Sequence, residues 1–272
     1  MSESKINFDE DRNFDDLHER FSKNIYQSLK GQIRLAVLRH DLQEVLPALW
    51  ESDSLSVLDA GGGLGMFTTE FARLGHRVNY CDISKKMLDS AAELARAEQL
   101  ATIQFHHESV QSHIERDCQY NVILLHAVLE WLADPRQVLE QVLSAMQAGS
   151  HLSLLFYNQQ SIVFRNLIRG NFFKASASDQ QGDKGSLTPS NPLKPDDVKS
   201  WISSHNDQND DGQPAYEICC ESGVRVFYDY SERERIALRT SDQVIETEIA
   251  FSRQEPYRAL GRYYHLIIKK LY

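Results

Sequence analysis

The feature that most constrains this fold is a glycine-rich turn between a short apolar run and an amphipathic stretch. The apolar run over 56–58 leads to Asp59, the letters AGGGLG follow over 60–65, and apolar positions of 67–74 recur at helical spacing before Gly75. This pattern predicts a strand, a turn and a helix. In open α/β sheets, nucleotide-like ligands bind at such a turn, outside the carboxyl end of the first strand. The turn is therefore the predicted ligand site.

Strand-like and helix-like segments alternate along the first 160 residues. Two helices are predicted before the first strand, over 15–30 and 32–46, with Gly31 as the break between them. Later helices are expected to begin after Ser84 and at Asp134 with Pro135, because these residues suit helix starts. The further strands are predicted over 77–81, 103–106, 121–125 and 151–157. Short connections of this kind imply an α/β fold: a Rossmann-like, mostly parallel, doubly wound sheet.

The second half of the chain has a weaker pattern. Residues 169–197 are polar and predict a long surface loop or lid. The predicted elements that follow are a short helix over 196–203, strand segments over 216–220 and 224–227 around Gly223, a helical stretch over 231–252 and a last strand over 263–268. We interpret residues 1–272 as one domain, with N-terminal helices over 15–50, a cofactor-binding core over 55–160 and a substrate-side part over 161–262.

Two classes of ligand compete for the glycine turn. A dinucleotide fingerprint, G-x-G-x-x-G, that starts at Gly61 or Gly63 needs glycine at position 66 or 68, where the chain has Met66 and Thr68. The sequence instead places the carboxylate of Asp59 beside the glycines, where it would repel a pyrophosphate and suit a cation. S-adenosylmethionine is a ligand of this kind, because it carries an ammonium and a sulfonium and no phosphate.

Two more strand ends supply candidate cofactor residues. Asp82 comes 21 residues after Gly61, at the end of the second predicted strand, where a carboxylate accepts ribose hydroxyls. His126 follows the fourth strand at the same sheet edge, and either lines the cofactor pocket or is a hydrogen-bonded core histidine. Glu130 and Trp131 are interpreted as packing at a helix start. The cofactor-binding residues predicted from the motifs are Asp59, Gly61, Gly62, Gly63, Asp82 and His126. A purely structural glycine turn is the alternative.

Composition and charge argue against several functions. The formal net charge of −10 disfavours general attraction to nucleic acid, but not a local basic patch. The longest apolar stretch, over 122–133, is shorter than the roughly 20 residues of a membrane helix, so no membrane partner is expected. The acidic N-terminus lacks the pattern of a secretion signal, and we expect a cytoplasmic protein.

The metal-binding residue types show no ligand spacing. His106, His107 and His113 match no metal motif, so they are interpreted as structural and no metal is predicted. The four cysteines form no C-x-x-C pair and lie in apolar surroundings, which predicts buried free thiols. They are Cys81, Cys118, Cys219 and Cys220.

Longer segments resemble a known enzyme family. The letters VLDAGGGLG, CDIS, LLHAVLEWLADPR and FYN resemble class I methyltransferases. The letters DRNFDDLHERFSKNIYQSLKGQIR, GVRVFYDY and RQEPYRALGRYYH are similar, more narrowly, to the bacterial tRNA 5-carboxymethoxyuridine methyltransferases, over about 11–269. The polar insertion over 205–213 departs from that pattern. The resemblance implies that S-adenosylmethionine is held by Arg34, Gly61, Gly62, Asp82, His126 and the backbone near Val110 and Gln111.

The same resemblance implies methyl transfer to the carboxylate of a modified wobble base in tRNA. A carboxylate is already ionised at neutral pH and needs no general base, so an arginine fork that holds it is the main requirement. Arg225 is our first candidate, and the further candidates are Arg262, Tyr157 and Tyr230.

A basic and aromatic segment is the candidate RNA-binding region. Arg165, Arg169 and Lys174 lie close to three phenylalanines, a composition that suits phosphates and the unstacked bases of an anticodon loop. A solvated helix face is the alternative. A small-molecule methyltransferase and a noncatalytic S-adenosylmethionine-binding protein also remain open, and no oligomeric state is predicted.

Overall fold

One seven-stranded sheet forms the centre of the molecule. The computed structural model describes residues 11–16, 18, 28–51, 54–116, 119–177, 180, 188–189, 191–206 and 214–272. The strands are β1 (Ser56–Ala60), β2 (Arg77–Asp82), β3 (Ile103–His107), β4 (Val122–His126), β5 (His151–Tyr157), β6 (Tyr216–Val224) and β7 (Tyr263–Lys270). Their order is β3-β2-β1-β4-β5-β7-β6. Among these seven, β7 alone is antiparallel to its neighbours β5 and β6. The predicted mostly parallel α/β sheet is confirmed.

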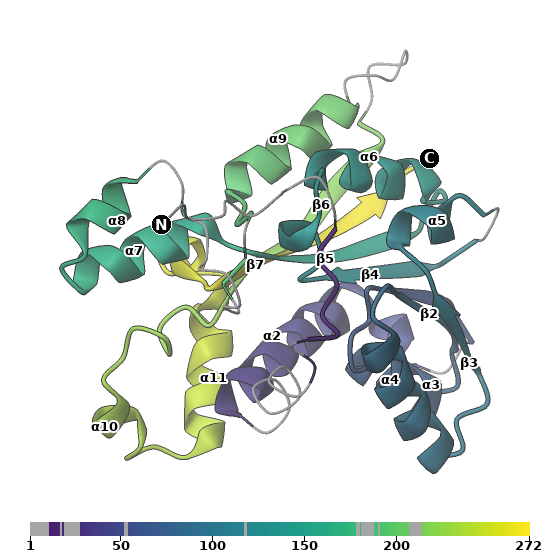
Figure 1. Ribbon diagram of the computed structural model, residues 1–272, viewed down its shortest axis with the longest axis horizontal. Coiled ribbons are helices and arrows are strands. Elements are labelled where there is room, and N and C mark those ends of the chain that lie inside the picture. The colour runs from purple at the N-terminus through teal and green to yellow at the C-terminus, as the bar shows by residue number, and fades with distance from the viewer. Residues whose placement is uncertain are drawn as a thin grey trace.

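Helices cover both faces of the sheet (Figure 1). One face carries α5 (Val110–Ile114), α6 (Pro135–Ala145) and α9 (Pro195–Asn206), and the other carries α2 (Leu29–Val45), α3 (Met66–Arg73), α4 (Lys85–Ala97) and α11 (Ser241–Ser252). Successive strand residues point to opposite faces. Leu58 therefore belongs to the first apolar core and Val57 to the second.

Two further helices and four short elements complete the fold. Helices α7 (Gln159–Ile168) and α8 (Phe172–Ser176) lie next to each other and project from one end of the molecule (Figure 1). The short elements η1 (Pro47–Leu49), η2 (Leu129–Trp131), α10 (Arg233–Ile236) and η3 (Arg258–Leu260) complete the described chain. Among the described residues, no helix is both long enough and apolar enough to cross a membrane.

The predicted helix starts after β2 and β4 are confirmed. The Ser84 side chain accepts a hydrogen bond from the backbone N–H of Met87 and caps α4. The Asp134 side chain accepts from the N–H of Gln137 at the start of α6, where Pro135 occupies the first turn. Local capping chemistry thus places two of the helices that flank the sheet edge.

The predicted N-terminal helices require a correction. Gly31 does not break a helix: it lies within α2, which begins at Leu29 behind the Ser28 cap. A glycine costs about 1 kcal/mol in a helix interior, and the packing of a buried helix overrides that preference. Most of the predicted helix over 15–30 lies outside the described residues.

Three predictions in the second half were wrong. The strand does not resume over 224–227, because β6 ends at Val224 and the chain turns at Arg225, whose φ is +62°. The predicted helix over 231–252 is two helices, since Thr240 and Gln243 form a capping box that starts α11. Gly223 is neither bulge nor turn. It lies in β6, where a side chain would overlap the carbonyl oxygen of Arg258, and the irregular pairing is between Ile218 and Cys220.

The predictions for the loop over 169–197 and for the cysteines agree with the structure only in part. Helix α8 and the start of α9 lie within the predicted loop over 169–197, part of which is outside the described residues. Cys81 and Cys220 are buried free thiols, as predicted, whereas Cys219, on the edge strand β6, is exposed. Cys118 lies outside the described residues.

Candidate active site

A cavity of about 660 Å³ opens at the carboxyl ends of the parallel strands. It is lined from β1 to β4, from α2 and from the ends of β5 and β7. The predicted site residues among its lining are Arg34, Asp59, Gly61, Gly62, Gly63, Asp82, Val110, Gln111, His126, Tyr157, Arg225 and Arg262. Tyr230, Arg165, Arg169 and Lys174 are outside this lining. One cavity therefore brings most of the sequence-predicted residues together.

The glycine turn is held tightly after β1. Gly61 has a φ of +68°, and a side chain there would lie 2.5 Å from Val128. A side chain at Gly62 would lie 2.6 Å from the ring of Tyr80. The N–H of Gly63 donates to Oδ2 of Asp82 at 3.0 Å. Glycine is thus required for conformation and for space, and the turn is fixed before any ligand binds.

Two carboxyls flank this turn, of which Asp59 is buried and Asp82 is half-buried. Asp59 accepts a hydrogen bond from the Thr68 hydroxyl at 2.5 Å, and burial raises the pKa of Asp59 to about 6. Asp82 accepts from the N–H groups of Gly63 and Ser84, and burial likewise raises its pKa above the ordinary value. These carboxyls make the β1–β2 side of the cavity suited to hydroxyl donors and positive charge.

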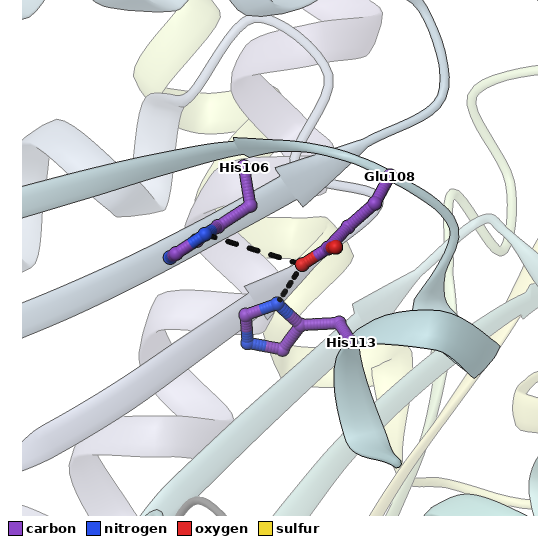
Figure 2. Close-up of side chains that lie close together, drawn as sticks. All are labelled: His106, Glu108 and His113. Atoms are coloured by element: carbon purple, nitrogen blue, oxygen red, sulfur yellow. Dashed lines mark hydrogen bonds and ion pairs between the residues drawn. The ribbon is translucent and has the colours of Figure 1, made fainter. Parts of the chain in front are cut away.

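Glu108 occupies the end of β3, between the rings of His106 and His113 (Figure 2). Its Oε1 is 2.8 Å from Nδ1 of His113 and 4.0 Å from Nδ1 of His106. The Arg116 guanidinium also pairs with Glu108, and Nε2 of His113 lies 2.8 Å from the hydroxyl of Tyr120. Arg116 thus supplies the cation at this cluster, and the hydrogen bonds hold Glu108 at the cavity wall.

Gln111 places an unpaired acceptor in the cavity wall. Its Nε2 donates to Oδ2 of Asp11 at 2.9 Å, while its buried Oε1 has no hydrogen-bond partner among the described residues. Asp11 also accepts from the N–H of Ala133. The Gln111 side chain is therefore oriented, and its oxygen is available to a ligand donor.

His126 ends β4 and reaches the cavity from a buried hydrogen-bond network. Its Nε2 is 2.8 Å from Oγ of Ser153, and its ring packs edge-on against Phe67. Burial, with smaller contributions from His265 and Arg34, lowers the pKa of His126 well below its ordinary value. Both interpretations of the sequence thus apply: His126 is hydrogen-bonded in the core and lines the cavity.

Glu130 is the main cavity residue that sequence reasoning missed. It is fully buried in η2, and neither carboxyl oxygen has a hydrogen-bond partner among the described residues. Burial raises its pKa to about 7, and nearby backbone N–H groups and the charge of Arg34 offset part of that shift. A buried carboxyl whose oxygens make no well-formed hydrogen bond is costly, so its place in the cavity wall indicates a ligand partner. The only available signal was an acidic residue inside an apolar run.

The opposite end of the cavity is cationic. Asp229, whose side chain is 4% exposed, lies 2.5 Å from Arg225, 3.3 Å from Arg262 and 3.5 Å from Lys30. Burial alone would raise the pKa of Asp229, but these three cations hold it below its ordinary value. One carboxylate thus faces three positive charges, and the cluster keeps an excess of positive charge.

The two candidate arginines differ in their remaining donors. Arg225 directs both Nε and Nη2 at Oδ2 of Asp229. Arg262, whose side chain is 8% exposed, has a buried Nη1 with no hydrogen-bond partner among the described residues. Its guanidinium lies 5.4 Å from the ring centre of Tyr157. Arg262 is therefore the arginine with a buried donor left for an anion.

Tyr263 lies between the two ends of the cavity. The sequence analysis did not name it as a site residue. The guanidinium groups of Arg34 and Arg225 lie 5.1 and 5.5 Å from the centre of its ring. Tyr230, a predicted candidate, instead donates its hydroxyl to the carbonyl oxygen of Leu260 at 2.7 Å.

The predicted RNA-binding residues lie on α7 and α8. The buried Nε of Arg165 has no partner among the described residues, and burial together with the charge of Arg262 lowers the pKa of Arg165. Arg169 follows α7, and Lys174 lies in α8 beside Phe173, which is 91% exposed. This part of the surface is basic, aromatic and close to the cationic end of the cavity.

The residues present fit S-adenosylmethionine. The acidic side of the cavity offers acceptors at Gln111 and Glu130 that no described residue pairs, and the carboxyl of Asp82 at the second strand end. Arg34 adds a cation beside Glu130, so both charges of an amino-acid group have a counterpart. The turn has no basic side chain for a pyrophosphate, and its carboxyls favour a cationic ligand.

Comparison with known proteins gives a consistent result. Residues 58–152 match a family model described as a methyltransferase domain. Over 265 residues the chain is 40% identical to the tRNA 5-carboxymethoxyuridine methyltransferases of Escherichia coli O157:H7 and of Escherichia coli strain K12, which covers 96% of this chain and 97% of each relative. It is 25% identical over 154 residues to the ubiquinone biosynthesis O-methyltransferase of Proteus mirabilis strain HI4320, covering 55% of this chain and 60% of the relative.

Solved structures support the fold. The magnesium protoporphyrin IX methyltransferase from Synechocystis PCC 6803, with bound SAH, superposes with a TM-score of 0.59 at 14% identity, covering 94% of this chain and 95% of that chain. The plantazolicin methyltransferase BamL, in complex with a triazolic desmethylPZN analog and SAH, superposes with a TM-score of 0.57 at 12% identity, covering 95% of each chain.

Proposed function

The chain belongs to the family of tRNA 5-carboxymethoxyuridine methyltransferases, and from that premise we propose how its cavity serves the reaction. The protein is an S-adenosylmethionine-dependent methyltransferase of class I fold. Its proposed substrate is the carboxylate of 5-carboxymethoxyuridine at the wobble position of tRNA, and the product is the methyl ester. A tRNA substrate is consistent with the expected cytoplasmic location.

The observation that carries this proposal is the excess of positive charge around Asp229. Three cations share this one buried carboxylate. Lys30 is 46% exposed, whereas Arg225 and Arg262 are 12% and 8% exposed. A neutral phenol or amine acceptor would leave the charge of one of these two arginines unpaired, whereas a carboxylate balances it. The cluster therefore favours an anionic acceptor over the neutral acceptors used by many small-molecule methyltransferases.

Arg262 is the proposed anchor of the acceptor carboxylate. It combines a buried donor without a partner with a place in the cavity wall beside Tyr157. Arg225, the first candidate from the sequence, acts through Asp229: its two hydrogen bonds fix the carboxylate that Arg262 also contacts. Tyr157 restricts the Arg262 guanidinium from one face, and Tyr230 supports this region by its bond to Leu260.

The cofactor is proposed to lie along the strand ends in a fixed order. Gln111 and the backbone at Val110 face the adenine, Asp82 faces the ribose hydroxyls, and the turn over 61–63 passes beneath with Asp59. The amino-acid end then falls between β4 and α2. There Arg34 pairs with the carboxylate, and Glu130 pairs with the ammonium.

The chemistry demands placement more than proton transfer. The cofactor supplies a methyl group on a sulfonium. Because the acceptor is already ionised at neutral pH, no residue has to remove a proton. Arg262 holds one carboxylate oxygen and leaves the other free for attack, and alignment of this kind contributes on the order of 7–11 kcal/mol. Burial of the cavity also favours a step that neutralises two opposite charges.

The surface of α7 and α8 is the proposed contact for the anticodon loop. Arg169 and Lys174 suit backbone phosphates, and the exposed rings of Phe172 and Phe173 suit unstacked bases. Arg165 lies between this surface and Arg262, which suits a phosphate next to the modified nucleotide. The surface leads to the cationic end of the cavity.

The function is tested by incubating the protein with S-adenosylmethionine and tRNA from a strain that lacks this methyltransferase. Nucleoside mass spectrometry is expected to show loss of 5-carboxymethoxyuridine and gain of its methyl ester. The matched control is tRNA with unmodified wobble uridine, which should gain no methyl group. Methylation of a phenolic precursor in place of the tRNA would instead support a small-molecule enzyme.

A further inference from the structure

A continuous line of buried hydrogen bonds runs from α2 to the cavity. Oδ2 of Asp41 is 2.8 Å from Nδ1 of His265, and Nε2 of His265 is 2.8 Å from Oγ of Ser153. The same Ser153 oxygen is 2.8 Å from Nε2 of His126, which lines the cavity. Asp41, Ser153 and His265 have no exposed surface. This relay, Asp41–His265–Ser153–His126, joins α2, β7, β5 and β4 without water.

The far end of the relay has a fixed charge. Oδ1 of Asp41 accepts from Nη2 of Arg253 at 2.7 Å and from the hydroxyl of Ser222 at 2.9 Å. Burial alone would raise the pKa of Asp41, but its hydrogen bonds with His265 and Arg253 and the charge of Arg253 lower it below the ordinary value. Asp41 is thus an ionised acceptor, and Nδ1 of His265 donates to it.

The direction of the remaining bonds follows from proton counting. Arg253 directs Nε and Nη2 at Asp41 and Nη1 at Glu44, whose side chain is 57% exposed, so Asp41 is its buried counter-charge. A cation at His265, which has no exposed surface, would leave this buried group with an excess of positive charge, whereas a neutral ring leaves it balanced. Neutral His265 with its proton on Nδ1 accepts at Nε2, and the Ser153 hydroxyl donates there. That hydroxyl has one hydrogen, so its oxygen must accept from Nε2–H of His126.

We propose that Asp41, His265 and Ser153 are positioning residues that keep His126 neutral with its proton on Nε2, so that Nδ1 remains an acceptor for the ammonium of the bound cofactor. This inference rests on the proposed function for the cofactor and its orientation. His126 ends β4, on the side of the turn away from Asp82 and the ribose. The donor that a ligand presents there is its amino-acid ammonium, which Glu130 also faces.

The tautomer of His126 is measurable by nitrogen-15 NMR of histidine-labelled protein, because protonated and unprotonated ring nitrogens resonate far apart. At pH 7.5 the wild type is expected to show His126 with a protonated Nε2 and an unprotonated Nδ1. A protonated Nδ1 in the wild type would overturn the proposal. That result would leave the proposed function intact, provided the wild type still binds S-adenosylhomocysteine.

Asp41→Asn is expected to reverse the donor and acceptor roles along the relay, while the side chain at position 41 keeps nearly the same size. Arg253 and Ser222 both donate toward the same oxygen, so they retain the amide oxygen on their side and turn the NH₂ group toward His265. His265 must then accept at Nδ1 and donate at Nε2, and the proton of His126 moves to Nδ1. An unchanged His126 tautomer in folded Asp41→Asn would contradict the proposal. Ser222→Ala, which lies outside the relay, should leave the tautomer unchanged.

Calorimetry with two ligands separates positioning from general damage. Asp41→Asn is expected to bind S-adenosylhomocysteine about tenfold more weakly, as for loss of one hydrogen bond to a charged group. It should bind 5′-methylthioadenosine, which lacks the amino-acid end, as the wild type does. Equal weakening for both ligands would indicate a structural role and overturn the proposal. If Asp41→Asn does not fold, Ser153→Ala is used: a mixed His126 tautomer with the same ligand selectivity supports the relay, and an unchanged tautomer refutes it.

Discussion

The two ends of the cavity differ in charge and in how their charge is arranged. Around the glycine turn, Asp59, Asp82 and Glu130 present carboxyls, two of which accept hydrogen bonds from neighbouring groups of the chain. At the other end, Arg225 and Arg262 surround one carboxylate, Asp229. The acidic end suits a cationic cofactor and the basic end suits an anionic acceptor. The two ends thus differ in charge, as suits a reaction between a cationic methyl donor and an anionic acceptor.

The largest effect is expected from breaking the basic end at Arg262. Arg262→Ala should lower kcat/KM for tRNA about a hundredfold, because it removes a charge-assisted contact that the acceptor needs for alignment. The affinity for S-adenosylhomocysteine should be nearly unchanged. Arg262→Lys should restore only part of the rate, since an ammonium lacks the planar fork. Steady-state kinetics and calorimetry measure both quantities. Full activity of Arg262→Lys would show that charge alone suffices.

The matching change at the acidic end is Asp82→Ala. It should weaken S-adenosylhomocysteine binding by roughly 1.5–3 kcal/mol, since ribose hydroxyls lose a charged acceptor and the N–H of Gly63 loses its partner. The KM for tRNA should change little. Calorimetry measures the affinity for S-adenosylhomocysteine, and steady-state kinetics measures the KM for tRNA. A larger loss in tRNA recognition than in cofactor affinity would contradict the division into two ends.

The pH dependence of cofactor binding sharpens the assignment of Glu130. Its pKa of about 7 in the free protein should fall when a cationic ammonium binds beside it. Glu130 should therefore release about 0.9 proton when the ligand binds at pH 6, and affinity should fall as the pH drops below 7. The release should be small at pH 8, where Glu130 is already ionised. Asp59, with a pKa of about 6, is itself about half protonated at pH 6, so the part that belongs to Glu130 is the part lost in a Glu130 variant.

Glu130→Gln provides the control for this pH effect. Calorimetry in buffers of different ionisation enthalpy counts the protons released, and the variant should release almost none between pH 7 and pH 8. Its affinity should also be nearly independent of pH in that range. Proton release equal to that of the wild type would assign the titration to another group.

The smallest effect is expected at the RNA surface. Phe173→Ala should weaken tRNA binding about fivefold, within the range found for one stacked base, and leave cofactor binding unchanged. Binding of the wild type should fall steeply with salt, whereas the stacking loss should persist at all salt concentrations. Leu238, which is 77% exposed on another surface, offers the control Leu238→Ala. Equal effects of the two changes would remove α8 from the RNA contact.

The acidic end was largely predictable from sequence, and the basic end was not. Asp59, the glycine turn and Asp82 follow consecutive strands, so their meeting at one sheet edge follows from the parallel topology alone. Asp229 and Arg262 come from segments after β6 and before β7, and Lys30 comes from α2. Their contact depends on where β7 inserts beside β5, which no local pattern specifies.

Local signals failed where packing decided the outcome. Gly31 was expected to end a helix, but burial of α2 against the sheet keeps it helical. Glu130 was interpreted as a packing residue because the surrounding sequence is apolar. In the structure it lies in η2 and lines the cavity. No sequence pattern predicted the hydrogen-bond network behind His126, because Asp41 and His265, which pair in it, are more than 200 residues apart.

The most direct test of the two-ended cavity compares two tRNAs that differ by one charge. Binding is measured in the presence of S-adenosylhomocysteine for tRNA with the wobble carboxylate and for tRNA with its neutral methyl ester. The wild type is predicted to bind the acid at least about tenfold more tightly, as expected for one charge-assisted contact. Arg262→Ala is predicted to bind both tRNAs alike. Equal binding of acid and ester by the wild type would contradict the account.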